Sequence, residues 1–117
     1  MRYVLVVDDN AVNRKLAVAL LKRRGMQAQE ADGGVVALHM LAQGGFDSVL
    51  LDISMPVMDG EEVCRQIRAN PAWRSLRVVA YTAHALESER QRIMAAGFDE
   101  LLIKPISMQD LLRALPD

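Results

Sequence analysis

Five short strand-like stretches alternate along this chain with five stretches whose apolar residues recur at helical spacing. The expected strands cover residues 3–7, 26–31, 48–51, 77–81 and 101–103. The expected helices cover residues 11–24, 33–43, 60–69 and 86–96, and a last helix runs to residue 115. Such alternation is typical of a parallel sheet with helices on both faces. The first and third strands are the richest in apolar residues, and placing them side by side with right-handed crossovers predicts the strand order 2-1-3-4-5.

The ends of the expected helices carry residues that begin or stop helices. Asn10, Asp32 and Ser107 each precede an expected helix, where a side-chain oxygen can accept the first backbone N–H groups. Gly25 and Gly97 follow the first and fourth helices, where glycine commonly ends a helix. The first helix carries a set of small and aliphatic residues at helical spacing: Val12, Leu16, Ala17, Ala19 and Leu20.

Length and charge restrict the class of protein. With 117 residues the chain has the size of one domain, and we expect a single domain over residues 1–117. Lysine and arginine number 14 against 15 acidic residues, and this net charge of -1 gives no support for direct nucleic-acid binding. No apolar run approaches the roughly 20 residues that span a bilayer, and the N-terminus lacks the features of a signal peptide. With Cys64 as the only cysteine, these features predict a cytoplasmic protein without a membrane segment.

Residues that can do chemistry stand at the ends of four expected strands. Asp8 and Asp9 follow the first strand, and Asp52 follows the third. Thr82 follows the fourth strand and Lys104 the fifth. Taken singly, each has an ordinary explanation as a helix cap, a turn residue or a solvated side chain. The carboxyl ends of parallel strands share one edge, however, and ligands bind there near the switch point between strands one and three. We therefore expect these five side chains to form one site.

The charges at this edge predict a divalent cation. Asp8, Asp9 and Asp52 would bring three negative charges into a small space, where carboxylates repel one another. One divalent ion together with Lys104 would neutralise them. Carboxylates, waters and a loop carbonyl such as that of Ser54 are the ligands that Mg²⁺ prefers, so we expect Mg²⁺, with Mn²⁺ able to substitute. A carboxylate in such a site can attack phosphorus and form an aspartyl phosphate, while the metal and the lysine neutralise charge on the phosphoryl oxygens.

Longer motifs around these residues resemble a known family. They are Val6-Val7-Asp8-Asp9-Asn10, Leu51-Asp52 with Met55-Pro56-Val57-Met58-Asp59-Gly60, Tyr81-Thr82-Ala83 and Lys104-Pro105. In order, and over nearly the whole chain, they resemble the receiver domain of two-component response regulators (CheY-like), in particular receivers of the hybrid histidine kinase type. The resemblance implies a doubly wound, flavodoxin-like α/β fold. It also implies a phosphorylation-dependent signalling switch that catalyses only its own phosphorylation and dephosphorylation.

The resemblance further implies a phosphoryl acceptor and a metal site. Asp52 would accept a phosphoryl group from a phosphohistidine on a sensor histidine kinase or a histidine phosphotransfer protein. Mg²⁺ would be bound by Asp52, by Asp9 directly, by Asp8 largely through water and by the main-chain carbonyl of Ser54.

The remaining motif residues would bind the phosphoryl group or shape the loops. The Thr82 side chain and the Ala83 amide would contact the phosphoryl group, and Lys104 would form a salt bridge with it. The Lys104–Pro105 peptide bond would be cis, as a tight functional turn permits. Pro56 and Gly60 would turn the chain away after Asp52, which would leave the carbonyl of Ser54 facing the metal.

The chain departs from the family at one switching position. Many receivers have a tyrosine or phenylalanine three residues before the lysine, whose ring turns inward on activation, whereas this chain has Leu101. Tyr81 is not an evident substitute, because its side chain should point away from that of its neighbour Thr82. Ser54 and His84 hold the positions that flank the approach of hydrolytic water in the family.

Family members commonly bind partners or dimerise through the face formed by the fourth helix, the fifth strand and the fifth helix. We therefore expect a downstream protein or a second copy of the chain to bind at this face. Most apolar residues of these helices should lie in the core, with an exposed subset available for contact. The candidates are Leu86, Ile93, Met94, Met108, Leu111, Leu112 and Leu115.

Two other functions are compatible with the same residues. A small Mg²⁺-dependent phosphohydrolase with an aspartate nucleophile would usually place that nucleophile after the first strand and need a cap or larger body, for which this chain has little room. A degenerate receiver could act purely as a binding module, although the complete set of acids, Thr82 and Lys104 argues against it.

Overall fold

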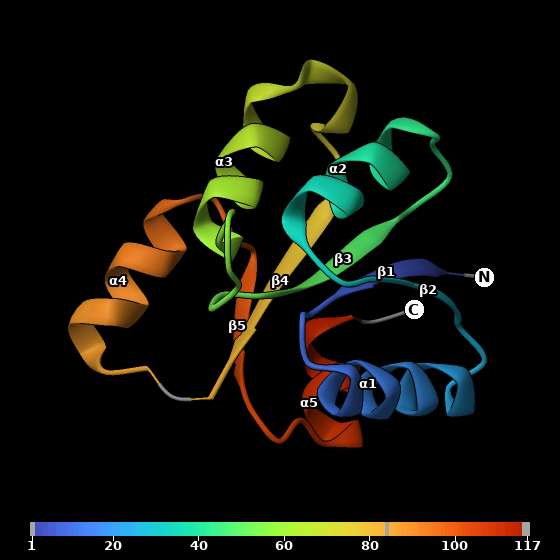
Figure 1. Cartoon of the computed structure of the whole chain (residues 1–117). Coiled ribbons are helices and arrows are strands. Elements are labelled where there is room, and N and C mark those ends of the chain that lie inside the picture. The colour runs from blue at the N-terminus through green and yellow to red at the C-terminus, as the bar shows by residue number, and fades with distance from the viewer. Residues whose placement is uncertain (1, 84, 116–117) are drawn as a thin grey trace.

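The computed structural model describes residues 2–83 and 85–115, and in them five parallel strands alternate with five α-helices (Figure 1). The strands are β1 (Tyr3–Val7), β2 (Gln27–Ala31), β3 (Ser48–Asp52), β4 (Arg77–Thr82) and β5 (Glu100–Ile103). The helices are α1 (Ala11–Arg23), α2 (Gly34–Ala42), α3 (Gly60–Ala69), α4 (Glu87–Ala95) and α5 (Met108–Ala114). The strands form one sheet in the order β2-β1-β3-β4-β5, which confirms the predicted fold class and strand order.

Helices cover both faces of the sheet and create two separate apolar cores. In Figure 1, α2 and α3 lie on one side of the sheet and α1 and α5 on the other, while α4 stands at the outer edge beside β5. The first core joins α2, α3 and Ile93 of α4 to side chains such as Leu5, Leu51 and Leu101. The second core joins α1 and α5 to side chains from the opposite face, among them Leu50 and Tyr81. The central strands are therefore buried on both faces, as parallel strands covered by helices require.

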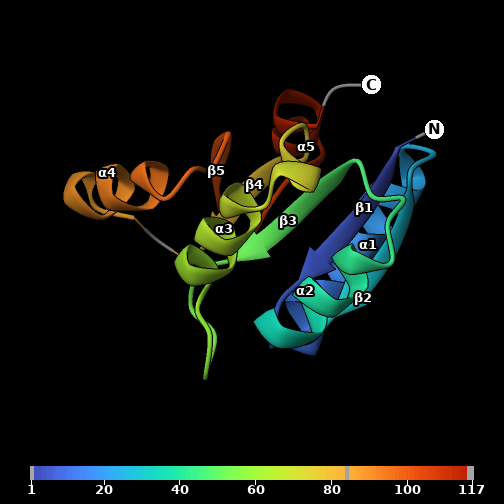
Figure 2. The same cartoon turned by 90° about the horizontal axis from the view of Figure 1, so that it is seen from above.

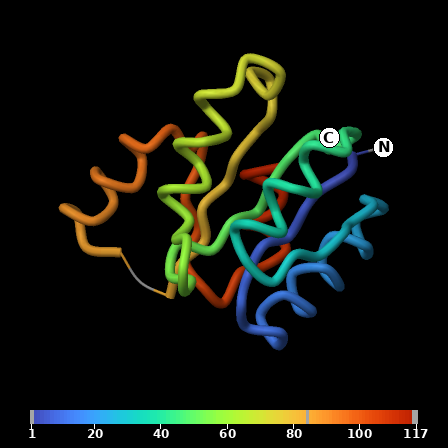
Figure 3. Tube along the Cα trace, turned by 45° about the horizontal axis from the view of Figure 1, so that its top comes forward, coloured from blue at the N-terminus to red at the C-terminus, as the bar shows by residue number. Residues whose placement is uncertain are grey.

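The two central strands bring distant parts of the chain to one edge. In Figure 3, β1 (blue) runs beside β3 (green), and Val7 is paired with Leu51 in the parallel ladder. Asp8 and Asp52, each one residue further along, thus lie side by side at the carboxyl edge of the sheet. Figure 2 shows the arrows of β1 and β3 pointing the same way, with the green loop between β3 and α3 extending beyond the strand ends.

Most of the predicted helix boundaries are confirmed, but one predicted cap is wrong. The Asn10 side chain accepts a hydrogen bond from the Asn13 amide, and Ser107 forms a capping box with Asp110. Asp32, in contrast, does not cap α2, because the helix begins one residue later and Gly33 occupies the cap position without a side-chain bond. A short 3₁₀ turn, η1 (Pro71–Trp73), follows α3 and was not expected from the sequence.

The buried face of α1 differs from the set of residues with helical spacing in the sequence. Ala17 of that set is buried as expected, but Val12 and Leu16 are exposed, and Val18 and Leu21 face the sheet in their place. Two aliphatic side chains therefore remain on the outer surface of α1, near the end that follows Asp8 and Asp9.

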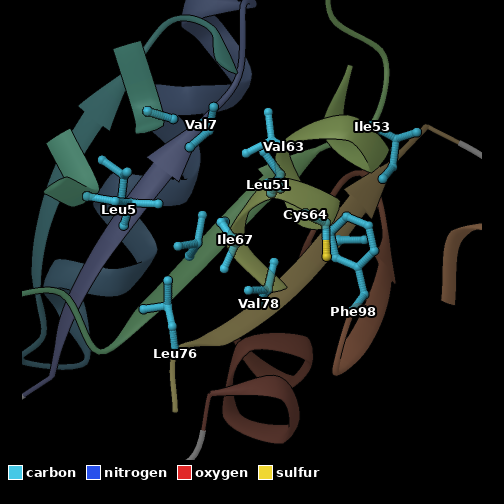
Figure 4. Packing of buried hydrophobic residues seen from close by; sticks show 14 of the residues in the cluster. Leu5, Val7, Leu51, Ile53, Val63, Cys64, Ile67, Leu76, Val78 and Phe98 are labelled. Atoms are coloured by element: carbon cyan, nitrogen blue, oxygen red, sulfur yellow. The ribbon is translucent and has the colours of Figure 1, made fainter. Parts of the chain in front are cut away.

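Cys64 lies in the first core, among Leu51, Ile67 and Phe98 (Figure 4). Burial raises the pKa of its thiol to about 11, so the side chain acts as a small apolar group and not as a nucleophile. Among residues 2–83 and 85–115, no helix combines the length and the apolar character needed to cross a bilayer.

Candidate functional site

Three aspartates meet at the carboxyl edge of the sheet. Asp8 follows β1 and is fully buried, and Asp52 ends β3 with 3% of its surface exposed. Asp9 is exposed at the mouth of the site. Each of the three offers a carboxylate oxygen, and these oxygens lie within 4.8 Å of one another. The predicted acidic cluster is therefore present in the fold.

Lys104 reaches two of these acids from the loop after the edge strand β5. It follows β5, and its Nζ lies 3.1 Å from Oδ2 of Asp8 and 3.1 Å from Oδ1 of Asp52. The backbone amide of Lys104 donates to the carbonyl oxygen of Thr82 at 2.7 Å, which fixes the start of this loop against the end of β4. One cation is thus shared by two nearly buried carboxylates, and such charge-assisted hydrogen bonds are stronger than neutral ones.

Asp8 has further donors that hold its carboxylate in place. The amide of Asn10 donates to Oδ1 at 2.9 Å, and the hydroxyl of Tyr81 donates to Oδ2 at 2.7 Å. The Arg14 guanidinium donates to the backbone carbonyl of Asp8 at 2.8 Å, so the main chain is anchored as well. Sequence reasoning considered Tyr81 only as a substitute for the switching aromatic residue and missed its hydrogen bond to Asp8.

The two buried acids differ in pKa. Burial raises the pKa of Asp52 to about 6, the Asp8 carboxylate raises it as well, and Lys104 opposes both effects. For Asp8, burial also acts to raise the pKa, but the hydrogen bonds from Asn10, Tyr81 and Lys104 outweigh it and the pKa is lowered. Burial and the neighbouring Asp8 raise the pKa of Tyr81, whose hydroxyl therefore stays protonated and acts as a donor.

Comparison with known proteins decides the family. The sequence model of the response regulator receiver domain matches residues 4–116. This chain belongs to the response regulator receiver domain family. The sensor protein GacS of Pseudomonas syringae is 41% identical over 96% of the chain, and the sensor histidine kinase RcsC of Salmonella typhi is 40% identical over 96%. The chain spans 13% and 12% of the lengths of these two relatives.

Solved receiver structures have the same fold. The receiver domain of sensor histidine kinase PA1611 from Pseudomonas aeruginosa, described with a magnesium ion coordinated in its active site cleft, superimposes with a TM-score of 0.87 at 32% identity. The match covers 96% of this chain and 92% of that one. The chemotaxis protein CheY4 of Vibrio cholerae gives a TM-score of 0.91 at 29% identity, covering 98% of this chain and 96% of that chain.

The other predicted positions of the receiver follow or end the strands, except Leu101, which lies within β5, and His84. Thr82 is buried at the end of β4, and Ala83 is exposed directly after it. Ser54 is exposed two residues after Asp52. Leu101 is buried on the first core face, opposite Ala80 in the ladder, and does not lie beside Tyr81. His84 lies outside the described residues.

The loop after Asp52 is closed by short hydrogen bonds. The Met58 amide donates to the Pro56 carbonyl at 2.8 Å, and the Gly60 amide donates to the Ile53 carbonyl at 3.0 Å. A side chain at position 60 would collide with the backbone carbonyl of Asp52, so α3 packs this closely against the end of β3 only with glycine there. On the other side of the site, the Lys104–Pro105 peptide bond is cis.

The pKa of Asp52 leads to a first prediction. Asp52 has a raised pKa, so its ionisation destabilises the metal-free fold; this penalty is fully present above about pH 6 and shrinks as the pH falls from there toward the ordinary value of 3.8. Asp52→Asn removes the charge, and we expect the free energy of unfolding in chelator at pH 8 to rise by about 1–2 kcal/mol. Urea titrations at pH 8 and pH 5 measure it. A stabilisation that is the same at both pH values would contradict the prediction.

Proposed function

We propose that this chain is a single receiver domain over residues 1–117, which accepts a phosphoryl group on Asp52 as a switch in a phosphorelay. The observation that carries the proposal is the position of Lys104, whose Nζ lies 3.1 Å from both Asp8 and Asp52 at the carboxyl edge of the sheet. Every residue of β3 is buried, so the Asp52 carboxylate is held at this edge by a rigid strand. A fixed nucleophile beside a fixed cation favours attack on phosphorus, because little reorganisation is needed.

In the proposed transfer, an oxygen of the Asp52 carboxylate forms a bond to phosphorus. The bond between phosphorus and the donor's histidine nitrogen breaks, and its electron pair stays on that nitrogen. Lys104 would then neutralise charge on the phosphoryl oxygens, while the Thr82 hydroxyl and the Ala83 amide donate hydrogen bonds to them. The chain thus modifies itself once per signal and does not turn over an external substrate.

The donor set supports Mg²⁺ at this site, with Mn²⁺ able to substitute. Asp9, Asp52 and the main-chain carbonyl of Ser54 would bind it, since hard oxygen ligands suit this ion. When bound, the ion would supply positive charge that offsets the acids and the phosphoryl oxygens. The magnesium ion described in the cleft of the related PA1611 receiver supports the assignment.

Asp8 fits a more distant role toward the metal. Its two carboxylate oxygens already accept hydrogen bonds from Asn10, Tyr81 and Lys104. A carboxylate with this many protein donors has little capacity left for direct coordination. Contact through a metal-bound water, as the resemblance implies, agrees with this geometry.

The relatives support a phosphohistidine as the donor. GacS and RcsC carry the names of a sensor protein and a sensor histidine kinase, so the donor for this receiver would be a histidine kinase or a histidine phosphotransfer protein. The output would pass to a downstream protein or a second copy through α4, β5 and α5. Leu86, Ile103 and Leu112 are exposed on or next to these elements, whereas Ile93, Leu111 and Leu115 are buried and cannot contribute contacts.

Incubation with acetyl phosphate and Mg²⁺ tests the proposal. Intact-mass spectrometry should show one added phosphoryl group on the wild type and none on Asp52→Asn, because the nucleophile is lost. Asp32→Asn is the matched control, since Asp32 is an exposed aspartate after the neighbouring strand β2. Steady release of phosphate from small phosphoesters would instead favour a phosphohydrolase. Failure of the wild type to bind Mg²⁺ would favour a receiver that works only as a binding module.

A further inference from the structure

Tyr81 connects the second apolar core to the acidic site. Its ring is fully enclosed on the α1 and α5 face of the sheet, together with Leu102 and Leu111. Its hydroxyl nevertheless reaches the edge of the sheet and donates to Oδ2 of Asp8 at 2.7 Å. A tyrosine can pack its ring in a core and place its polar tip at a site beyond it.

Tyr81 and Lys104 act on the same oxygen. Lys104 Nζ also donates to Oδ2 of Asp8, at 3.1 Å, and lies 4.6 Å from the centre of the Tyr81 ring. Oδ2 of Asp8 therefore has two donors, one fixed in the core and one on a flexible lysine. Asp8 itself is fully buried, so an oxygen that loses its donors cannot turn to bulk water for replacement.

Phosphorylation would change which negatively charged groups Lys104 pairs with. Before transfer, Lys104 neutralises the carboxylates of Asp8 and Asp52. After transfer, the negative charge at position 52 would reside on the phosphoryl oxygens, further from the strand end, and the ammonium group would follow this charge outward. Its hydrogen bond to Asp8 would then lengthen or break.

We propose that Tyr81 is a positioning residue that keeps Oδ2 of Asp8 hydrogen-bonded while Lys104 moves to the phosphoryl group. The inference rests on the proposed function, since it needs a phosphoryl group on Asp52. With the tyrosine hydroxyl in place, the lysine can leave without stranding a buried carboxylate oxygen. Without it, the phosphorylated state alone would carry that penalty, because Lys104 still serves Asp8 in the unphosphorylated state.

Tyr81→Phe tests this, because it removes the hydroxyl and keeps the ring in the core. Beryllofluoride, added with Mg²⁺, serves as the probe of the phosphorylated state, and Mg²⁺ alone as the probe of the unphosphorylated one. We expect the dissociation constant for beryllofluoride to rise about tenfold, since in that state only the variant leaves buried Oδ2 of Asp8 without either of its two donors. The dissociation constant for Mg²⁺ should change by less than about threefold. Tyr3→Phe is the matched control, since Tyr3 stacks on Phe46 at the opposite end of β1 and should leave both constants unchanged.

The outcomes separate the inference from the proposed function. If Tyr81→Phe binds beryllofluoride as the wild type does, or if both constants weaken equally, the positioning role is wrong while the receiver function stands. If the wild type itself binds no beryllofluoride and takes up no phosphoryl group, the proposed function fails, and the positioning role fails with it.

A second test uses the wild-type protein alone, so its result does not depend on whether a variant folds. The hydroxyl proton of Tyr81, protected by its bond to Asp8, should remain visible by NMR after beryllofluoride binds. Its disappearance on binding would show that the bond breaks, and would overturn the inference.

Discussion

Lys104→Met will lower the free energy of unfolding of the metal-free protein by about 3 kcal/mol at pH 8, because it leaves two buried carboxylates facing each other without a cation. Lys104 is only 15% exposed, and its two partners are almost fully enclosed. Methionine preserves much of the apolar stem of lysine, so the change reports mainly on the lost charge. Denaturant titration in chelator measures the effect.

The size of this loss should depend on pH in a defined direction. The pKa of Asp52 is already raised to about 6, and loss of the lysine removes a group that lowers it, so the pKa rises further. At pH 5 Asp52 is protonated, and one of the two facing charges has gone. The destabilisation by Lys104→Met should therefore be smaller at pH 5 than at pH 8. Saturating Mg²⁺ should also reduce it, since the ion replaces part of the lost positive charge.

Lys15→Met provides the matched control. Lys15 pairs with Glu30 on the surface and is 68% exposed, so its removal should change the free energy of unfolding by no more than about 0.5 kcal/mol. If Lys104→Met destabilises equally at pH 5 and pH 8, the loss comes from packing and not from repulsion between Asp8 and Asp52.

The grouping of the site residues was predictable from the sequence, because the carboxyl ends of parallel strands lie at one edge of the sheet. Once strands and helices alternate, the carboxyl ends of β1, β3, β4 and β5 must share an edge, and this placed Asp8, Asp52 and Lys104 in one site without any knowledge of contacts. Capping was predictable where a side chain accepts the local N–H groups, as at Asn10 and Ser107. At Asp32 the same rule failed, because α2 begins one residue later than the spacing suggested.

Other features depend on which face of a helix packs on the sheet and on how far a side chain reaches, and the spacing of residues in the sequence shows neither. Helix α1 packs on the sheet through the face that carries Val18 and Leu21. Val12 and Leu16 are therefore exposed despite their helical spacing. Strand alternation predicted only that Tyr81 points away from Thr82, and the structure places its ring in the core opposite to that of Leu101. The alternation could not show that the tyrosine ring is long enough to carry its hydroxyl past the strand end to Asp8.

Gly60→Ala will lower the free energy of unfolding by about 2–3 kcal/mol, although alanine is the better helix former. The added methyl group would collide with the backbone carbonyl of Asp52 and with Cα of Ile53. Both contacts are backbone atoms, which cannot rotate away as a side chain could, so β3 or α3 must shift. The gain from helix propensity is only about 1 kcal/mol and is outweighed.

The same substitution should also slow phosphorylation, because the atoms that must shift belong to Asp52 and its neighbour. Displacement of a nucleophile by a fraction of an ångström reduces the rate of transfer, and we expect uptake from acetyl phosphate to fall by about tenfold or more. Gly33→Ala is the control, since a methyl group there meets nothing within 4 Å and its backbone is extended, with φ of -172°. We expect that variant to stay within about 0.5 kcal/mol of the wild type, because the entropy gained and the weaker cap nearly cancel. A Gly60→Ala protein as stable and as reactive as the wild type would mean that the junction of β3 and α3 is not the constraint that orients Asp52.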